Sequence, residues 1–83
     1  SNDKNHILDG KHNWNKMIPN PRDPNNWGKI AEIISTVLVN GAQQKYGTAP
    51  NVYSKTLEIG GKIVMVTYRI IDGVMHISNA WVR

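Results

Sequence analysis

Two histidines and a lysine near the start of the chain could carry out acid–base chemistry on a phosphodiester. His6 and His12 are six residues apart, and Lys11 adjoins His12. Metal-independent RNA cleavage needs one group to accept the proton of the ribose 2′-hydroxyl and another to donate a proton to the leaving 5′-oxygen. Histidine suits both roles because its pKa lies near neutrality. A lysine can stabilise the charge that builds up on the phosphate oxygens.

The same spacing leaves two other uses of these residues open. Each histidine can be a solvated surface residue, since three histidines in 83 residues are not unusual. His6, Asp9 and His12 are also spaced by three residues, so a helical turn could bring them together around zinc. However, Gly10 interrupts that helix, no fourth ligand is evident, and Lys11 would lie beside the cation. We therefore favour acid–base chemistry and expect no metal or other cofactor.

The elements that must position this segment begin with helices. Apolar residues recur at helical spacing over residues 27–38, which predicts a helix with one face in the core. Asp23 or Asn25 can cap its start, and Asn40-Gly41 supplies its end.

A shorter helix is expected over residues 11–17, anchored by Trp14. A loop is expected at residues 42–51, and three strands follow it, at residues 52–59, 62–71 and 74–82. The strands are joined at Gly60-Gly61 and Asp72-Gly73, which are typical two-residue hairpin turns. Helices followed by an antiparallel meander predict an α+β fold, and the chain length predicts one domain spanning residues 1–83.

The turns also predict which side chains share a face of the sheet. A two-residue loop at residues 72–73 places Arg69 opposite His76 and Thr67 opposite Ser78. Because side chains alternate between faces, these four lie together on a polar face. The neighbouring strand adds Ser54 and Thr56. This face is either the plain solvated side of an antiparallel sheet or, beside the histidine-bearing segment, one wall of a cleft.

The opposite face is apolar and is expected to meet the helix in the core. Its members are Tyr53, Leu57, Val64, Val66, Tyr68, Ile70, Met75, Ile77 and Trp81. Lys55 also falls on this side. Either its side chain reaches out at an edge of the sheet, or the register is shifted by one residue at that end.

The charge of the chain favours a polyanionic partner. Lysine and arginine number 10 against 6 acidic residues, giving a net charge of +4. Such a balance suits a nucleic acid or an acidic protein, and it also serves plain solubility. The chain has no cysteine, so no disulfide can hold it together. No apolar run reaches membrane-spanning length, and we expect no membrane partner.

Several runs of the sequence resemble the polymorphic toxin type 35 domain. They are His6-Ile7-Leu8, Lys11-His12-Asn13-Trp14, residues 20–30, Val66-Thr67-Tyr68 and residues 77–82. Such domains are C-terminal modules of contact-dependent growth inhibition toxins and related polymorphic toxins. The family is placed in the barnase/EndoU/colicin/RelE-like ribonuclease superfamily. Its members have N-terminal helices followed by a curved antiparallel sheet, here of three to four strands, with the active site across that sheet.

The resemblance implies roles for the residues considered above. His6, His12 and Lys11 would lie on the substrate phosphate, and Thr67 and Ser78 would contribute hydroxyl groups. It also implies a toxin endoribonuclease that acts on RNA, in many cases tRNA, and is blocked by a cognate immunity protein, which we expect to be acidic. Such a domain is secreted as part of a larger cell-surface protein and acts in the cytoplasm of the target bacterium.

Four further residues are candidates for substrate binding. The superfamily often uses a tyrosine, but the register sends Tyr68 to the core, so either Tyr68 is structural or the register is wrong. Arg69 and His76 are on the polar face. Trp14 can stack on a base or, more simply, anchor the core.

The expected reaction is attack of a 2′-hydroxyl on the adjacent phosphate. It leaves a 2′,3′-cyclic phosphate and spares DNA, which lacks that hydroxyl. Two alternatives stay open, a non-catalytic RNA-binding module and a protein-interaction domain.

Overall fold

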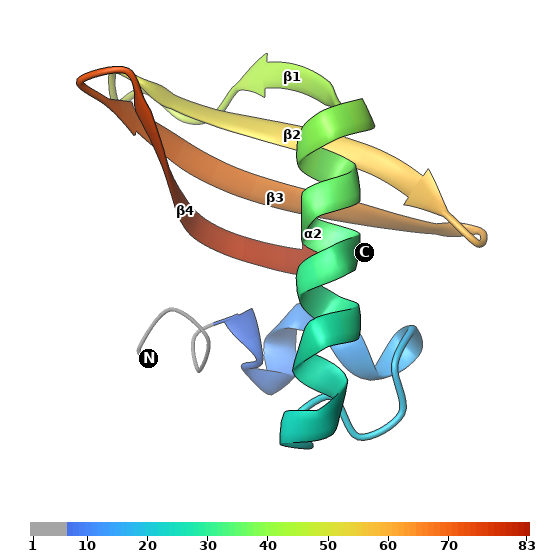
Figure 1. The fold of residues 1–83 in the computed structure, drawn as a ribbon. Coiled ribbons are helices and arrows are strands. Elements are labelled where there is room, and N and C mark those ends of the chain that lie inside the picture. Colours follow the sequence, from blue (N-terminus) through green and yellow to red (C-terminus); the bar gives the residue numbers. More distant parts are fainter. Residues whose placement is uncertain (1–6) are drawn as a thin grey trace.

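A single long helix lies across one face of a four-stranded antiparallel sheet (Figure 1). The computed structural model describes residues 7–83, except for the side chain of Lys11. Its elements are the 3₁₀ turns η1 (Gly10–His12), η2 (Trp14–Lys16) and η3 (Pro24–Asn26), helix α2 (Trp27–Asn40), and strands β1 (Ala42–Lys45), β2 (Val52–Ile59), β3 (Lys62–Ile71) and β4 (Val74–Val82). The α+β class is confirmed, and β1 forms within the segment that was expected to be a loop.

The ends of α2 differ in how closely they follow the sequence pattern. Asp23 accepts a hydrogen bond from the Asn25 backbone N–H at 3.0 Å, so it caps η3 and not α2 itself. At the other end, a Cβ on Gly41 would lie 2.5 Å from the Val37 carbonyl oxygen and 2.8 Å from that of Thr56. Only glycine fits between the helix end and β2. The prediction that α2 ends at Asn40-Gly41 is therefore confirmed.

Both hairpin turns form as expected. Gly60 and Gly61 have φ values of 57° and 80°, and Asp72 and Gly73 have φ values of 52° and 79°. Two consecutive residues with positive φ are the mark of the type I′ turn, whose twist matches that of the flanking strands. These turns set the register of β2 with β3. They also set the pairing of the end of β3 with the start of β4, from Ile71 opposite Val74 to Tyr68 opposite Ile77.

A β-bulge interrupts the pairing of β3 with β4. The pairing follows the prediction as far as Tyr68 opposite Ile77, but Thr67 then pairs with Asn79 and not with Ser78. Ser78 is thus the extra residue on β4, and the expected pairing of Thr67 with Ser78 is wrong. A bulge of this kind shifts the alternation of side chains by one residue.

The bulge exchanges the two faces over the last part of β4. Ala80 and Val82 are fully buried in the core, whereas Trp81 is only partly buried. Trp81 pairs with Met65 in the sheet, and its ring packs near that of His12 instead of the helix. The prediction that Trp81 belongs to the core face is therefore wrong, because the extra residue turned its side chain to the other face.

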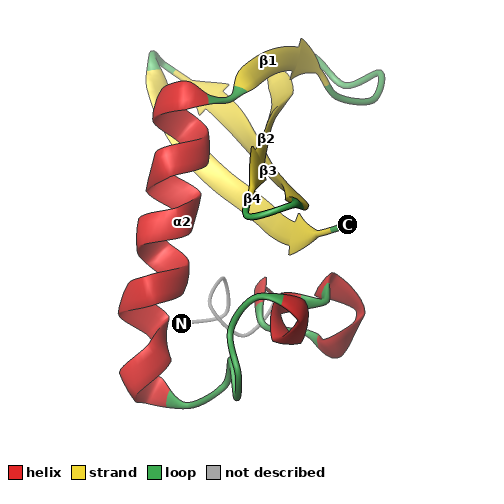
Figure 2. Cartoon of the chain, turned by 90° about the vertical axis from the view of Figure 1, so that its right-hand side faces the viewer, coloured by secondary structure: helices red, strands yellow, loops and turns green. Residues whose placement is uncertain are grey.

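The N-terminal segment packs on the edge of β4 (Figure 2). Trp14 is 2% exposed, and its Nε1–H donates to the Ala80 carbonyl at 3.1 Å. Asn13 donates through Nδ2 to the Val82 carbonyl at 3.2 Å. The helix expected over residues 11–17 is wrong: Asn13 has a φ of 62°, and this left-handed residue separates η1 from η2.

Lys55 and α2 are joined by a hydrogen bond. The Lys55 Nζ donates to the Leu38 carbonyl oxygen at 2.6 Å. The last carbonyls of a helix lack partners within the helix and attract cations. Lys55 thus lies on the helix side with its ammonium at the C-terminal end of α2. The register at this end is not shifted, but the side chain reaches the helix and not an edge of the sheet, because β2 lies between β1 and β3.

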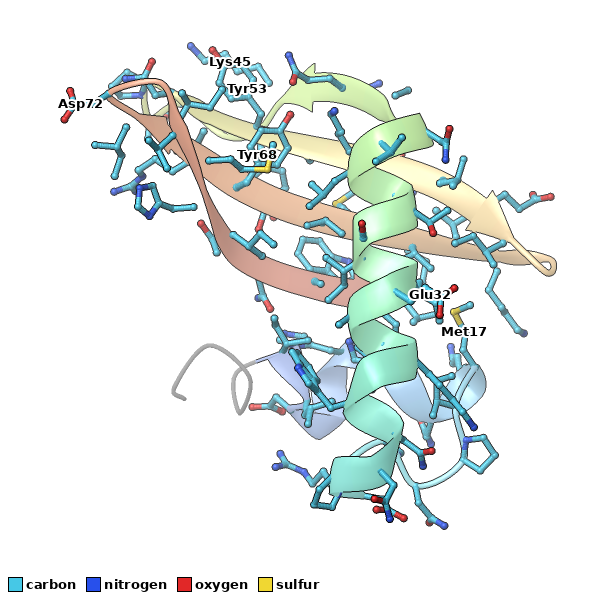
Figure 3. All side chains as sticks on the ribbon, viewed as in Figure 1. Met17, Glu32, Lys45, Tyr53, Tyr68 and Asp72 are labelled. Carbon is cyan, nitrogen blue, oxygen red and sulfur yellow. The ribbon has the colours of Figure 1, made fainter. Side chains whose placement is uncertain are left out.

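Tyr68 is fully buried on the helix side of the sheet, as the register predicts. Its hydroxyl donates to the side-chain oxygen of Gln43, and its ring stacks on Tyr53 with centroids 5.9 Å apart (Figure 3). Burial, and then the nearby Tyr53, raise the pKa of the Tyr68 hydroxyl. Tyr68 is therefore a structural residue.

The raised pKa of Tyr68 predicts a loss of stability in base. Above about pH 10 the tyrosine ionises in the unfolded chain before it ionises in the folded protein. The folded state then holds more protons than the unfolded state, and the free energy of unfolding falls as the pH rises. Tyr68→Phe should flatten this fall in urea unfolding between pH 8 and 11, whereas Tyr46→Phe, at an exposed tyrosine, should not. An equal slope in Tyr68→Phe and the parent protein would contradict the assignment.

Candidate active site

His12 is buried, and both of its ring nitrogens have polar partners. The side chain is 5% exposed. Its Nδ1 lies 3.1 Å from the Ile7 carbonyl oxygen, and its Nε2 lies 3.3 Å from Nδ2 of Asn79. The ring is thus held between the N-terminal segment and β4.

These partners select one tautomer of the imidazole. The Ile7 carbonyl can only accept, so His12 Nδ1 carries the proton. The Asn79 Oδ1 accepts from the Ala80 backbone N–H at 2.9 Å, which turns the Asn79 NH₂ group toward the ring. An NH₂ group can only donate, so Nε2 must offer a lone pair. For the neutral ring, the network therefore selects the tautomer with its proton on Nδ1 and a lone pair on Nε2, the atom that can act as a general base.

His12 and Asn79 line a shallow, open pocket of about 290 Å³ together with Tyr46 and Trp81. The Trp81 ring lies 6.2 Å from that of His12 and 6.2 Å from that of Tyr46, measured between centroids. The Tyr46–Trp81 pair is close to edge-on, with 61° between the planes. The pocket thus combines an imidazole and an amide with two aromatic walls.

A row of polar side chains leads from this pocket across the sheet. Asn79 pairs with Thr67, Thr67 with Ser54, and Ser54 with Gln44, so the four share one face. The Thr67 hydroxyl lies 3.5 Å from the Asn79 carbonyl oxygen. Thr67 and Ser54 are buried. The polar face is therefore present, and its row of hydroxyl and amide groups ends at His12.

Arg69 and His76 form the next row on the same face. They pair with each other across β3 and β4, as expected, and both are exposed. Arg69 also lines a second pocket, with Asn51 and Asp72 near the tip of the β3–β4 hairpin. These two residues are accessible to a polyanion but do not line the His12 pocket.

The structure places the other expected site residues as follows. His6 and the Lys11 side chain lie outside the described residues. Ser78 is exposed at the bulge. Asn79 lies opposite Thr67, in the position that was expected for Ser78. Tyr68 is on the opposite face, and Trp14 is enclosed in the core, so neither reaches the His12 pocket.

Three residues of the pocket were not anticipated from sequence. Asn79 and Trp81 were not predicted on this face because the bulge, which the alternation of side chains does not show, moved them there. Tyr46 lies directly after β1, within the segment expected to be a loop, and its backbone N–H donates to the Val52 carbonyl at 3.1 Å. Each depends on a local irregularity that alternation alone does not reveal.

Within residues 7–83, no group of three or more histidine, cysteine or acidic side chains is arranged to hold a metal ion. The zinc alternative requires His6, which lies outside this range. The other histidine of that set, His12, has Nδ1 beside the Ile7 carbonyl oxygen and Nε2 beside the Asn79 amide.

Comparison with known proteins gives one match. The model of the family described as bacterial toxin 35 matches residues 1–82, so the chain belongs to this family of bacterial toxins. No curated protein and no solved structure matches. No helix among the described residues is long and apolar enough to cross a membrane.

Proposed function

We propose that this toxin domain is a metal-independent endoribonuclease with His12 as its general base. The observation that carries the proposal is the hydrogen-bond network of His12, with the proton fixed on Nδ1 by Ile7 and the lone pair on Nε2 facing the Asn79 amide at an open pocket. A histidine whose neutral tautomer offers Nε2 beside an amide donor suits proton abstraction next to a phosphate.

The proposed reaction is an in-line displacement at phosphorus. His12 Nε2 takes the proton of the 2′-hydroxyl, and that oxygen forms a bond to the adjacent phosphorus. The bond from phosphorus to the 5′-oxygen breaks, and the leaving oxygen receives a proton from a second group, which we assign to His6. The products are a 2′,3′-cyclic phosphate and a 5′-hydroxyl end. Lys11 would stabilise the negative charge on the phosphoryl oxygens.

Asn79 and Thr67 would complete the site from the sheet. The Asn79 NH₂ group can turn its hydrogen bond from Nε2 to a phosphoryl oxygen once substrate is bound, which frees the lone pair of His12. Thr67 lies directly beside Asn79 and can add a hydroxyl donor. Amide and hydroxyl donors placed where charge develops lower the barrier most effectively in a fixed framework such as a sheet.

RNA is the proposed substrate, tRNA in particular, and DNA is not. The mechanism requires a 2′-hydroxyl, and the net charge of +4 favours a polyanion. We further propose that an acidic immunity protein blocks the domain. Delivery would be by contact-dependent growth inhibition as part of a larger secreted toxin, with action in the cytoplasm of the target bacterium.

Incubation of the purified domain with total tRNA in the presence of EDTA tests the activity. We expect discrete fragments, with no loss of activity on chelation. Intact tRNA that co-migrates with the domain would instead favour a non-catalytic RNA-binding module. Intact tRNA without binding would favour a protein-interaction domain, and both results would contradict the proposal.

Asn79→Asp should move the pH dependence of cleavage. A carboxylate at this position would hold a proton on His12 Nε2, so the base form would appear only at higher pH. We expect the acidic limb of the kcat/KM profile to shift upward by about one pH unit. Asn79→Ala, which removes the partner without adding charge, should lower kcat without such a shift. Superimposable profiles of Asn79→Asp and the parent protein would show that Asn79 does not act on His12.

A further inference from the structure

The pocket beside His12 has two aromatic walls that the proposed chemistry does not use. Tyr46 is 43% exposed, and Trp81 is partly exposed on the face of the sheet that carries Thr67 and Asn79. Trp14, by comparison, is enclosed in the core. Aromatic rings left open beside a phosphate-directed histidine offer a surface to a ligand that has its own flat π face.

The spacing of the rings limits how such a ligand can bind. A flat ring held between two parallel rings needs about 7 Å between them, which is two contacts of about 3.5 Å. The Tyr46 and Trp81 centroids are only 6.2 Å apart, and their planes meet at 61°. The pair therefore cannot enclose a base as a sandwich. One nucleobase can stack on the face of one ring while the other ring contacts the edge of that nucleobase.

We propose that Tyr46 and Trp81 form a subsite for one unpaired nucleobase next to the scissile phosphate. The inference rests on the proposed ribonuclease function and specifies its substrate. The Trp81 ring lies 6.2 Å from the His12 ring, measured between centroids. A nucleotide whose nucleobase stacks on Trp81 therefore has its ribose near His12, the proposed general base. A base within a duplex is already stacked on both faces, so the subsite selects single-stranded or looped RNA.

Stacking gives this subsite a characteristic selectivity. Every nucleobase has a π face, so stacking discriminates weakly among the four bases but strongly against a ribose phosphate without a base. We therefore expect a preference for unpaired structure more than for sequence.

NMR spectra of the ¹⁵N-labelled domain test binding without any cleavage. Adenosine 3′-monophosphate and uridine 3′-monophosphate should both shift the indole N–H signal of Trp81 at millimolar concentrations. The signal of Trp14, whose Nε1–H is bonded to Ala80, is the internal control and should stay in place. Ribose 5-phosphate should leave the Trp81 signal unchanged. No shift with either nucleotide, or an equal shift with ribose 5-phosphate, would overturn the subsite.

Cleavage of a short single-stranded RNA provides the second arm. Tyr46→Ala should raise KM by roughly tenfold, because one base–aromatic contact is lost, with a smaller change in kcat. Tyr46→Phe keeps the ring and should behave like the parent domain. Cleavage of the same sequence in a duplex should be slow in all three proteins. An unchanged KM in Tyr46→Ala, or equal cleavage of duplex and single strand, would refute the subsite while leaving the ribonuclease activity established.

Discussion

Replacement of His12 by alanine should lower RNA cleavage by about 10²- to 10⁴-fold, the range expected for loss of a positioned general base. The same variant should lose its toxicity when expressed without an immunity protein. The reason is local: Asn79, Thr67 and the aromatic walls remain, but none of the other described residues that line the pocket can accept the 2′-hydroxyl proton. Cleavage rates on tRNA and growth after induced expression both measure the effect.

Two controls separate catalysis from folding in this experiment. His12 is 5% exposed, so its loss also leaves a small cavity. The indole signal of Trp14 in the NMR spectrum reports whether the N-terminal segment still packs on β4. His76→Ala removes the exposed histidine of the same sheet face and should change the rate by only a few-fold. A folded His12→Ala domain with full activity would exclude His12 from the site.

Replacement of Trp14 by alanine should destabilise the domain by about 3–5 kcal/mol, the usual cost of removing a large buried aromatic side chain. Trp14 fills the space between the N-terminal segment and β4 and satisfies the Ala80 carbonyl. A domain of this size has a free energy of unfolding of only about 4–12 kcal/mol. Chemical unfolding should therefore show most of the stability lost, and the His12 segment should detach from the sheet.

Trp14→Phe distinguishes this structural role from base stacking. Phenylalanine keeps most of the apolar volume but leaves the Ala80 carbonyl without its donor, which should cost about 1–3 kcal/mol. RNA binding per folded molecule should be unchanged. If Trp14 instead stacked on a base, the variant would keep its stability and lose affinity for single-stranded RNA.

The sheet could be predicted from sequence wherever its turns control it. Two-residue turns that require positive φ have few alternatives, so Gly60-Gly61 and Asp72-Gly73 fixed the pairing nearest to them. The burial of Tyr68 and the position of Lys55 on the helix side followed from that register. The polar face with Arg69 opposite His76 followed from it as well.

The predicted register of β3 with β4 failed at the bulge. One extra residue costs little in a strand, and no residue type requires it, so its position depends on how the two faces pack. A signal was present in the spacing of Ile77, Ala80 and Val82, since a step of three between core residues does not fit an uninterrupted strand. The adjacent polar pair Ser78-Asn79 marks the same point. Comparing the alternation of side chains before and after that pair would have placed Asn79 and Trp81 on the same face as Thr67.

The anchor of the N-terminal segment could be predicted from sequence, but the shape of the segment could not. The types and spacing of its residues singled out His12 as a candidate, and the apolar spacing identified Trp14 as an anchor. The left-handed Asn13 between two 3₁₀ turns depends on hydrogen bonds to β4, which is nearly 70 residues away. The position of Tyr46 could not be predicted for a similar reason, because its contact with Trp81 is set by packing across the sheet and not by its neighbours in sequence.

The chemistry of the RNA ends tests the central claim most directly. An RNA cleaved by the purified domain at a mapped position should carry a 2′,3′-cyclic phosphate on one fragment and a 5′-hydroxyl on the other. A single 2′-deoxy substitution at the nucleotide before the cut should abolish cleavage there, because the nucleophile is gone. Fragments that end in a 3′-hydroxyl and a 5′-phosphate, or undiminished cutting of the 2′-deoxy substrate, would contradict His12-dependent attack by the 2′-hydroxyl.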